Sequence, residues 1–291
     1  MGIPARFRKQ EGRHALVDGI PFRMPIAAHN TPALMAGFTI DFDKAAALLP
    51  HSIHPLRMGR KSVLVVTVID YRQTVIGKYI EFSVAIGCTR GARPAPPLLP
   101  LIFQGLYGMG QYVYDLPVST EISVKGGKGI FGMPKHQSNL DFKIGERTVS
   151  SQYDQDGQMA VRIEIDRPGR AWLPITVAAI NYCSFRGMIV KSTIYSAGKV
   201  GFSLFKKGSA KLCIGEHPRV QALKALEISP NPIFTAFFPE IHGMLDDHIE
   251  SWYATYTEPP KTKPEGMESV INLGLSEAWL PPPQDLPDCK P

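Results

Sequence analysis

"KSVLVVTVIDYRQTVIGKYIEFSVAIGC", residues 61–88, is the stretch that decides the fold class of this chain. Two runs in it, 61–71 and 78–88, are rich in β-branched and aromatic residues, and the segment RQTVIG lies between them. Such runs are typical of strands, and a short connection between two of them is typical of a hairpin. The stretch therefore predicts two antiparallel strands.

Two further segments extend this pattern along the chain. Residues 138–168 alternate apolar and polar side chains around turn signals at IGER and DQDG, which predicts a meander of antiparallel strands. Residues 191–215 have the same character and the same prediction. Short blocks of β-branched and aromatic residues, bounded by glycine or charge, recur in the chain, so strands are expected to dominate the fold.

Helices are expected at few places. Residues 41–50 begin with aspartates that can cap a helix and end at a proline, and residues 217–228 carry Pro218 in a first turn before spaced apolar residues. A third helix is predicted within residues 240–256. The fold class expected from these patterns is α+β and β-rich, with large antiparallel or mixed sheets and a few packed helices.

Length and composition indicate one large domain with a tail. The chain has 291 residues, of which 44% are hydrophobic and 20% charged, as in an ordinary globular protein. We expect a single domain over residues 1–256 and a Pro-rich, extended C-terminal extension over residues 257–291. Residues 93–112 are apolar and rich in proline and glycine, which fits a lid, an oligomer contact or a packed loop.

Charge and cysteine content limit the classes of partner. The formal charge of +6 suits an anionic ligand, but basic residues form no long run and aromatic residues do not interleave with them, so no nucleic-acid partner is expected. The four cysteines form no CxxC pair, which predicts neither a zinc knuckle nor a disulfide framework. Without a signal-peptide pattern or a membrane-length apolar stretch, a cytoplasmic protein with no membrane partner is expected.

"KGGKGIFGMPKHQ", residues 125–137, is the most unusual segment and has three interpretations. A Walker-type phosphate loop needs Ser or Thr after its lysine and a helix where Pro134 stands, and neither condition is met. The GxGxxG spacing of residues 127–132 lacks the βαβ context of a dinucleotide site. A surface turn with solvated lysines is the interpretation that residue types alone favour.

One feature of this segment favours a reactive lysine instead. Ile130, Phe131, Met133 and Pro134 lie directly before Lys135, so apolar side chains surround one amine in the sequence. An ordinary lysine, with a pKa of about 10.4, is almost entirely protonated at pH 7, and apolar surroundings favour the neutral amine that attacks a carbonyl group. The segment is therefore also a candidate mount for a nucleophilic lysine.

The segment GMPKHQSNLDF, residues 132–142, resembles the lysine segment of acetoacetate decarboxylase-like proteins, in which the lysine after a proline forms a Schiff base. Other short stretches resemble this family in the same order along the chain, namely 29–50, 77–82, 111–124 and 208–228. The resemblance therefore extends over most of residues 20–255. The resemblance implies a cone-like or barrel-like sheet around the lysine, a homo-oligomer, and no metal or other cofactor.

The resemblance assigns residues to the site. It implies Lys135 as the Schiff-base lysine and Glu81 as the acid–base residue. Phe131, Met133, His136 and Lys128 are expected to contact the substrate. The chain departs from the family pattern at His136, where the family has a second lysine, and at Thr31, where our pairing places its substrate-binding arginine. Lys125 or Lys128 could replace the missing cation or face water.

The resemblance implies a lyase that acts on a small β-keto or oxo acid, most simply by acetoacetate decarboxylase-like decarboxylation through a lysine iminium. Two alternatives stay open: a Schiff-base aldolase or dehydratase on pyruvate-like substrates, and a noncatalytic protein that binds an apolar carbonyl ligand. Histidines at 51 and 54, and the segment HGMLDDH (242–248), could contribute to a metal site, but without a third ligand solvated side chains are the favoured interpretation.

Overall fold

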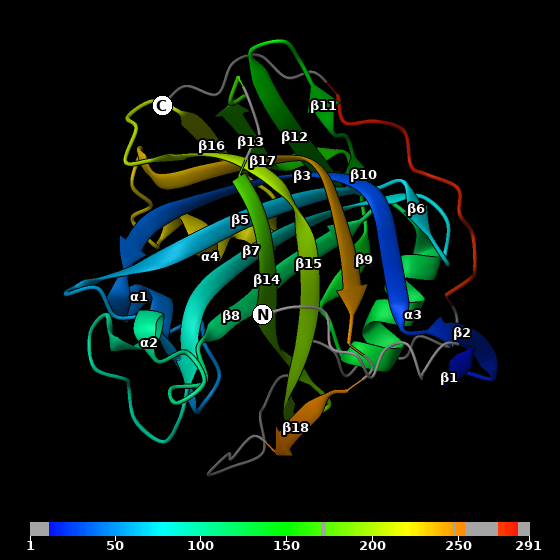
Figure 1. The fold of residues 1–291 in the computed structure, drawn as a ribbon, viewed down its shortest axis with the longest axis horizontal. Coiled ribbons are helices and arrows are strands. Elements are labelled where there is room, and N and C mark those ends of the chain that lie inside the picture. The colour runs from blue at the N-terminus through cyan, green and yellow to red at the C-terminus, as the bar shows by residue number, and fades with distance from the viewer. Residues whose placement is uncertain (1–11, 170–172, 247, 254–272, 285–291) are drawn as a thin grey trace.

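The computed structural model describes residues 12–169, 173–246, 248–253 and 273–284. Strands dominate this part of the chain and form a large sheet, a smaller sheet packed on it and a separate hairpin (Figure 1). The predicted α+β, β-rich class with a barrel-like sheet is confirmed. None of the described helices has both the length and the apolar character needed to cross a membrane.

Seven strands of the large sheet close into a barrel. Neighbours run antiparallel, except that β14 and β8 are parallel and share only two residue pairs, Asn181 with Gln111 and Tyr182 with Tyr112. Pairing of β7 with β8 closes the barrel. In order around it, the strands are β7 (Tyr79–Arg90), β5 (Lys61–Tyr71), β3 (Ile26–Asp41), β17 (Pro232–Leu245), β15 (Met188–Leu204), β14 (Leu173–Phe185) and β8 (Gly110–Val118).

The hairpin predicted from residues 61–88 is confirmed, because β5 and β7 pair from Leu64 with Ile86 to Tyr71 with Tyr79. Short strands extend the barrel at its rims: β4 (Ile53–Pro55), β6 (Gln73–Thr74), β9 (Lys135–Gln137) and β18 (Glu250–Tyr253). A separate hairpin consists of β1 (Arg13–Val17) and β2 (Ile20–Met24) and packs on the helix that follows β8.

The main hydrophobic core lies outside the barrel, between its wall and the smaller sheet. Alternate residues of β7, namely Ile80, Phe82, Val84 and Ile86, point into this core, and β3 and β5 contribute in the same way. Because successive side chains of a strand point to opposite faces, the intervening residues face the barrel interior. The smaller sheet comprises β10 (Asn139–Leu140), β11 (Lys143–Ile144), β12 (Thr148–Gln155), β13 (Gln158–Asp166) and β16 (Ala210–Ile214).

The meander predicted over residues 138–168 is confirmed, since β10, β11 and β13 all pair with β12. The meander predicted over residues 191–215 is wrong. The strands β15 and β16 belong to different sheets, because the chain turns at residues 205–209 and leaves the barrel to pair with β13.

Two predicted helices are present and short. The helix α1 (Phe42–Ala46) is capped by the Asp41 side chain, and η2 (Pro218–Val220) continues into α4 (Gln221–Lys224) with Leu223 buried in the core. The helix predicted within residues 240–256 is wrong, because residues up to Leu245 continue the pairing of β17 with β3 and β15.

A helix that the sequence did not predict is central to the site. The helix α3 (Glu121–Phe131) contains three of the glycines of residues 125–137 and ends at Gly132, whose φ of 65° is in the left-handed region. Glycine disfavours helices, so propensity alone argued for a loop. The close approach of neighbouring side chains explains the glycines: a Cβ at Gly126 would lie 2.9 Å from Phe22, and one at Gly129 would lie 2.5 Å from Val17.

Two remaining segments lie at the surface of the barrel. Residues 93–112 contain the short helix α2 (Leu99–Ile102), around which Ile102, Phe103 and Leu106 are exposed. Residues 273–284, drawn in red in Figure 1, run without helix or strand past α3 toward the smaller sheet. Their contacts include Gln284, whose backbone N–H donates to the carboxylate of Asp154. The rest of the predicted extension lies outside the described residues.

Candidate active site

Strand alternation directs Glu81 into the barrel. Its neighbours Ile80 and Phe82 point into the main core, so Glu81 faces the opposite side of β7. It is paired with Ile69 of β5 and Val118 of β8, which places it within the barrel wall. The residue is buried, with an exposed fraction of 8%. A buried carboxylate of this kind needs a charged or hydrogen-bonded partner.

Lys135 is that partner. It is the first residue of β9, which runs parallel to β8 and pairs Lys135 with Leu116. Its Nζ lies 2.7 Å from Oε2 of Glu81, and Lys135 is itself only 5% exposed. The structure thus brings together the two residues predicted to carry the chemistry. Both charges are removed from solvent, and each is the other's closest counter-ion.

The glycine-rich helix α3 holds the Lys135 side chain in place. A Cβ at Gly127 would lie 2.5 Å from Cδ of Lys135 and 2.7 Å from Cε, so only a glycine leaves room for the lysine stem at this point. One turn earlier in the helix, Oγ of Ser123 accepts a hydrogen bond of 3.0 Å from the same Nζ. The glycines of the segment 125–137 therefore allow α3 to hold Nζ of Lys135 in position.

Two stacked tyrosines complete the surroundings of the amine. The ring centroid of Tyr79 lies 5.3 Å from Nζ of Lys135, and the rings of Tyr79 and Tyr71 stack with centroids 4.5 Å apart. Burial, together with the negative charge of Glu81, raises the pKa of both phenols well above the usual value. Both therefore stay neutral at physiological pH, and Tyr71 can donate a hydrogen bond to Glu81.

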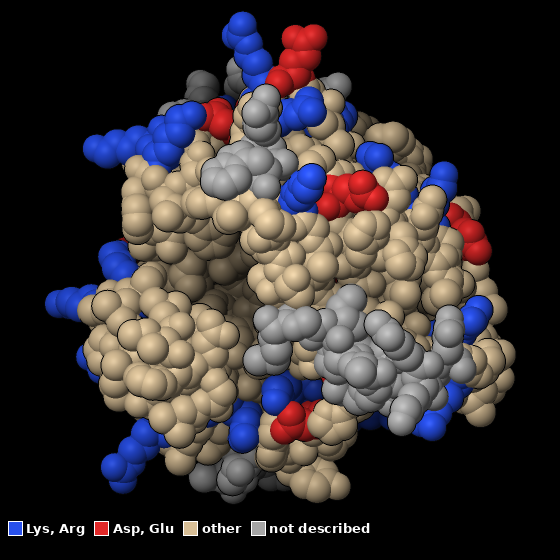
Figure 2. Space-filling view, in the orientation of Figure 1, with Lys and Arg blue, Asp and Glu red and all other residues tan. Residues whose placement is uncertain are grey.

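Two adjoining cavities meet at the Lys135–Glu81 pair. The lysine cavity, of about 60 Å³, is lined by both residues and by Tyr71, Tyr79 and Thr31. The lumen cavity, of about 150 Å³, lies inside the barrel and is lined by all seven barrel strands. Glu81 and Met133 line both. In Figure 2 the surface is hollowed in front of β7 and β8, which both contribute lining residues, beside the lobe that carries α2.

The predicted substrate-contacting residues separate into two groups. Met133 lines both cavities. Phe131 is buried in the same hydrophobic cluster as Met133 but lines neither cavity, and Lys128, which is 9% exposed on α3, also lines neither. His136 follows Lys135 in a strand and so points to the other side, where its Nε2 lies 2.9 Å from Oδ1 of Asp115. The candidate site therefore includes Met133 but not the other three.

Neither Lys125 nor Lys128 takes the place of the family's substrate-binding arginine in the cavity lining. Lys125 and Lys128 are both buried rather than solvated. Nζ of Lys125 lies 3.1 Å from Oδ2 of Asp18 and donates to the backbone carbonyl of Leu273, and Lys125 lines neither cavity. Among the described residues that line the two cavities, Lys135 is the only Lys or Arg.

His136 belongs to a buried polar cluster behind β9. Asp115 receives hydrogen bonds from Tyr153 at 2.5 Å and Arg219 at 3.2 Å in addition to its contact with His136. Burial alone would raise the pKa of Asp115, but these three partners hold that pKa below its ordinary value. The cluster ties β8, β12 and β9 together, and so supports the strand on which Lys135 stands.

Ser123, Tyr79 and Tyr71 were missed by sequence reasoning. Their proximity to Lys135 depends on the packing of α3, β5 and β7, which no local pattern records. One local signal was available, because Tyr79 and Glu81 are two residues apart and so share a face of a predicted strand.

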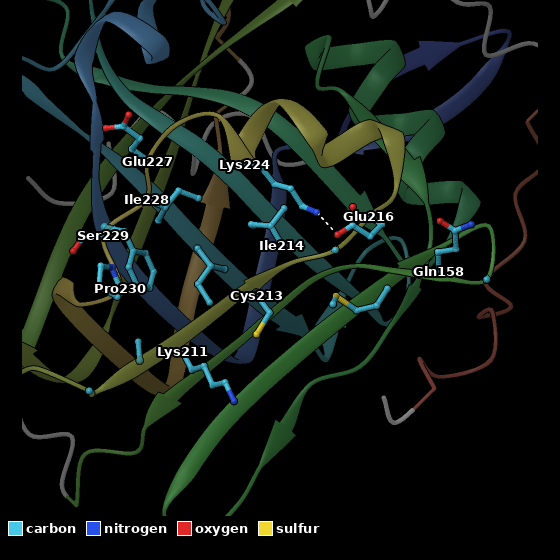
Figure 3. A pocket seen from close by; sticks show the side chains of 17 residues that line it. Gln158, Lys211, Cys213, Ile214, Glu216, Lys224, Glu227, Ile228, Ser229 and Pro230 are labelled. Atoms are coloured by element: carbon cyan, nitrogen blue, oxygen red, sulfur yellow. Dashed lines mark hydrogen bonds and ion pairs between the residues drawn. The ribbon is translucent and has the colours of Figure 1, made fainter. Parts of the chain in front are cut away.

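The other candidate sites fit a metal ion or a reaction less well than the Lys135–Glu81 pair does. No group of three or more His, Cys, Asp or Glu side chains in the described residues could hold a metal ion. Of the segment 242–248, residues 242–245 form the end of β17, where His242 contacts His29. A larger open groove, of about 1220 Å³, lies between β16 and the segment after α4 (Figure 3). Its charged residues are Lys211, Glu216, Lys224 and Glu227, of which Lys224 and Glu216 pair with each other, and it includes neither Lys135 nor Glu81.

The fold and the site together define a β-barrel protein with a buried lysine–carboxylate pair beside an internal cavity. A family model described as acetoacetate decarboxylase (ADC) matches residues 7–180, which is more than half of the chain. The chain belongs to the acetoacetate decarboxylase family. No curated protein matches it in sequence.

Several solved structures have a similar fold. An acetoacetate decarboxylase matches with a TM-score of 0.57 and 14% identity, over 81% of this chain and 92% of that chain. The acetoacetate decarboxylase of Legionella pneumophila matches with a TM-score of 0.54 and 12% identity, over 84% and 93%. The enduracididine biosynthesis enzyme MppR, complexed with pyruvate, matches with a TM-score of 0.53 and 15% identity, over 78% and 90%. At these identities the likeness shows the fold.

Proposed function

We propose that this protein is a Schiff-base lyase that decarboxylates a 3-oxo acid through Lys135. The observation that carries the proposal is the 2.7 Å contact between Lys135 and Glu81, two buried residues at the junction of two cavities. A lysine must be neutral to attack a carbonyl group, and a carboxylate at hydrogen-bond distance is positioned to take its proton. Family membership supports the same chemistry.

The first half of the reaction builds an electron sink. The Lys135 ammonium transfers a proton to Glu81, and the neutral amine adds to the keto carbon of the substrate. The carbinolamine loses its hydroxyl as water, with Glu81 returning the proton, and an iminium forms. Ser123, at 3.0 Å from Nζ, and the face of Tyr79 would orient the nitrogen during these steps.

The second half breaks the carbon–carbon bond. The electron pair of the bond to the carboxylate moves toward the iminium nitrogen, carbon dioxide leaves, and an enamine remains. A proton taken from solvent, delivered through Glu81, adds to the enamine carbon. Water then hydrolyses the iminium to release a ketone and the Lys135 ammonium. The net reaction consumes one proton and one 3-oxo acid anion and yields one ketone and one carbon dioxide.

The charges of the cavity lining favour decarboxylation over a reaction that keeps the carboxylate. In the described lining, Glu81 and Lys135 are the only Asp, Glu, Lys or Arg residues, so a substrate carboxylate meets no permanent cation apart from the reacting nitrogen. An aldolase or dehydratase on a pyruvate-like substrate must hold that carboxylate through the whole cycle. Loss of carbon dioxide removes the charge, which suits a site without a second cation.

Borohydride trapping tests the proposal. The protein is incubated with acetoacetate, pyruvate or a longer 3-oxo acid, reduced with borohydride and mapped by peptide mass. We expect a reduced adduct at Lys135 that is absent in Lys135→Ala and retained in Lys78→Ala, which removes an exposed lysine outside both cavities. An adduct at another lysine would move the site, and no adduct with any of the compounds would favour a noncatalytic binding protein.

Product analysis then separates the reactions. Release of one carbon dioxide per ketone supports the decarboxylase. Adduct formation with pyruvate, without carbon dioxide release but with incorporation of an added aldehyde, would replace it with the aldolase alternative.

A further inference from the structure

We propose that the substrate carries an apolar group of about six carbons, bonded to the keto carbon, and that this group fills the lumen cavity during the reaction. This inference rests on the proposed function in one respect, because the keto group of the substrate is taken from it. The position and chemistry of the apolar group come from the barrel interior, and one arm of the test below does not depend on the reaction.

The shape of the interior connects the amine with the lumen. The two cavities share these lining residues: Ile69, Glu81, Met133, Ile194, Ser196 and Ile241. A keto carbon held at Nζ of Lys135 therefore lies at the edge of the lumen cavity. One substituent of that carbon can stay in the lysine cavity, and the other can extend past Glu81 and Met133 into the barrel.

The lining of the lumen cavity determines the chemistry of the second substituent. Beyond the shared residues, most of its wall is apolar, with Met35, Val113, Ile175, Val177 and Phe238 contributed by four strands. Among the described residues, Glu81 is the one Asp, Glu, Lys or Arg of this lining, and it is paired with Lys135. Such a wall gives no counter-ion to a charged group but gains from contact with hydrocarbon.

The polar side chains of the lumen leave this conclusion unchanged. Gln111 and Asn181 hydrogen bond to each other at 2.8 Å, at the point where β8 and β14 pair. The amide pair thereby joins two strands of the wall. Thr67, Ser83 and Ser196 contribute short hydroxyl groups, which present little polar surface next to the aliphatic side chains.

The volume of the lumen cavity determines the size of the group. An apolar cavity of about 150 Å³ accommodates a molecule of the size of benzene, and the lumen cavity has about that volume. A methyl ketone such as acetoacetate would leave it unfilled. Each methylene buried in it should raise kcat/KM about fourfold, up to the length at which the space is full.

A chain-length series tests the inference. Decarboxylation rates are measured for acetoacetate, 3-oxohexanoate, 3-oxononanoate and 3-oxododecanoate, whose groups beyond the keto carbon run from methyl to nonyl. We expect kcat/KM to rise about 10²- to 10³-fold from acetoacetate to 3-oxononanoate and to rise no further with 3-oxododecanoate. Equal values for acetoacetate and 3-oxononanoate would overturn the inference, while trapping of acetoacetate at Lys135 would still uphold the proposed function.

A matched pair of variants places the group in the lumen. Ala179 lines the lumen cavity but not the lysine cavity, whereas its neighbour Ala178 lines neither. We expect Ala179→Leu to abolish the preference for 3-oxononanoate over acetoacetate, because the larger side chain fills part of the lumen cavity. Ala178→Leu should keep the preference. Loss of the preference in both variants, or in neither, would contradict a group bound at this position.

A binding experiment with the Lys135→Ala variant tests the lumen cavity without the reaction, because this variant lacks the lysine that would form the iminium. The affinities of 2-octanone and butanone for this variant are compared by calorimetry. We expect 2-octanone to bind at least about tenfold more tightly, and the difference to disappear when Ala179→Leu is added. That result supports the lumen assignment even if no 3-oxo acid is decarboxylated. Equal affinities of the two ketones would overturn the assignment, whatever the trapping experiment shows.

Discussion

Lys125 and Lys135 are both buried and both lie next to a carboxylate, but their surroundings differ. Lys125 contacts Asp18 in the turn between β1 and β2 and the carbonyl of Leu273, so it ties a hairpin and the C-terminal segment to α3. Lys135 contacts Glu81 and also lines a cavity. Burial and charge pairing therefore do not identify a reactive lysine. Space for a substrate next to the nitrogen is what distinguishes Lys135.

The largest expected effect comes from exchanging the two lysines in turn. Lys135→Ala should lower the decarboxylation rate by about 10⁴-fold or more, because no other lysine of the described residues lines the two cavities. Lys125→Met should leave adduct formation intact and lower the free energy of unfolding by about 1–3 kcal/mol, because Asp18 loses its partner. A decarboxylation assay measures the rate, borohydride trapping measures adduct formation, and denaturant unfolding measures the free energy of unfolding. A Lys125→Met protein that folds but forms no adduct would contradict the comparison.

Glu81→Gln tests the partner of Lys135, the lysine proposed to react. The amide can still hydrogen bond to Lys135 but cannot accept its proton, so kcat should fall about 10²- to 10³-fold while the fold is kept. Glu146→Gln, at an exposed position, is the control. Steady-state kinetics on both variants, with circular dichroism for the fold, check the result. A Glu81→Gln variant with full activity would show that the carboxylate only balances charge.

Two glycines of α3 provide a smaller and more specific contrast. In Gly127→Ala the new methyl group would collide with the Lys135 stem, and the rate of adduct formation should fall by about 10- to 100-fold through displacement of the amine. In Gly129→Ala the collision is with Val17 of β1 instead. That variant should lose stability but keep its adduct rate. Equal adduct rates in the two variants would argue against α3 as the mount of Lys135.

Asp115 should have the smallest effect on the lysine chemistry and a clear effect on pH-dependent stability. Its pKa is lowered in the folded state, so its ionised form stabilises the protein above its unfolded pKa of about 3.9, and this contribution is lost as the pH falls through the lower folded value. Asp115→Asn should flatten the acid limb of the unfolding curve below about pH 4. Chemical denaturation of both proteins between pH 2 and pH 7 measures this pH dependence of the free energy of unfolding. An unchanged acid limb would show that other carboxylates control acid unfolding.

The parts of the fold that follow from local pattern were predictable. The hairpin of β5 and β7 and the pairings around β12 come from two-residue alternation and turn signals, which act over a few residues. The helix α3 was not predictable, because glycine disfavours helices and the reason for its glycines lies in Phe22, Val17 and Lys135, which contact them only after folding. Residues 240–245 were also misjudged, since pairing with β3 and β15 outweighs their local preference.

The candidate site was predictable only in part. Lys135 and Glu81 were assigned through resemblance to a family, and their contact depends on the parallel pairing of β9 with β8. His136, which follows Lys135 in the sequence, was expected to contact the substrate. In a strand, however, adjacent residues face opposite sides, and Asp115 provides its partner there. Ser123 and Tyr79 required the tertiary structure.

The strands β3, β5 and β7 are shared between two separate interiors. One side of each fills the core against the smaller sheet, and the other side lines the space next to Lys135. Exchanges on the inner side leave the packing of the outer side in place. Substitution of a few residues that face the barrel interior is therefore expected to change ligand preference among relatives of this protein without loss of thermal stability.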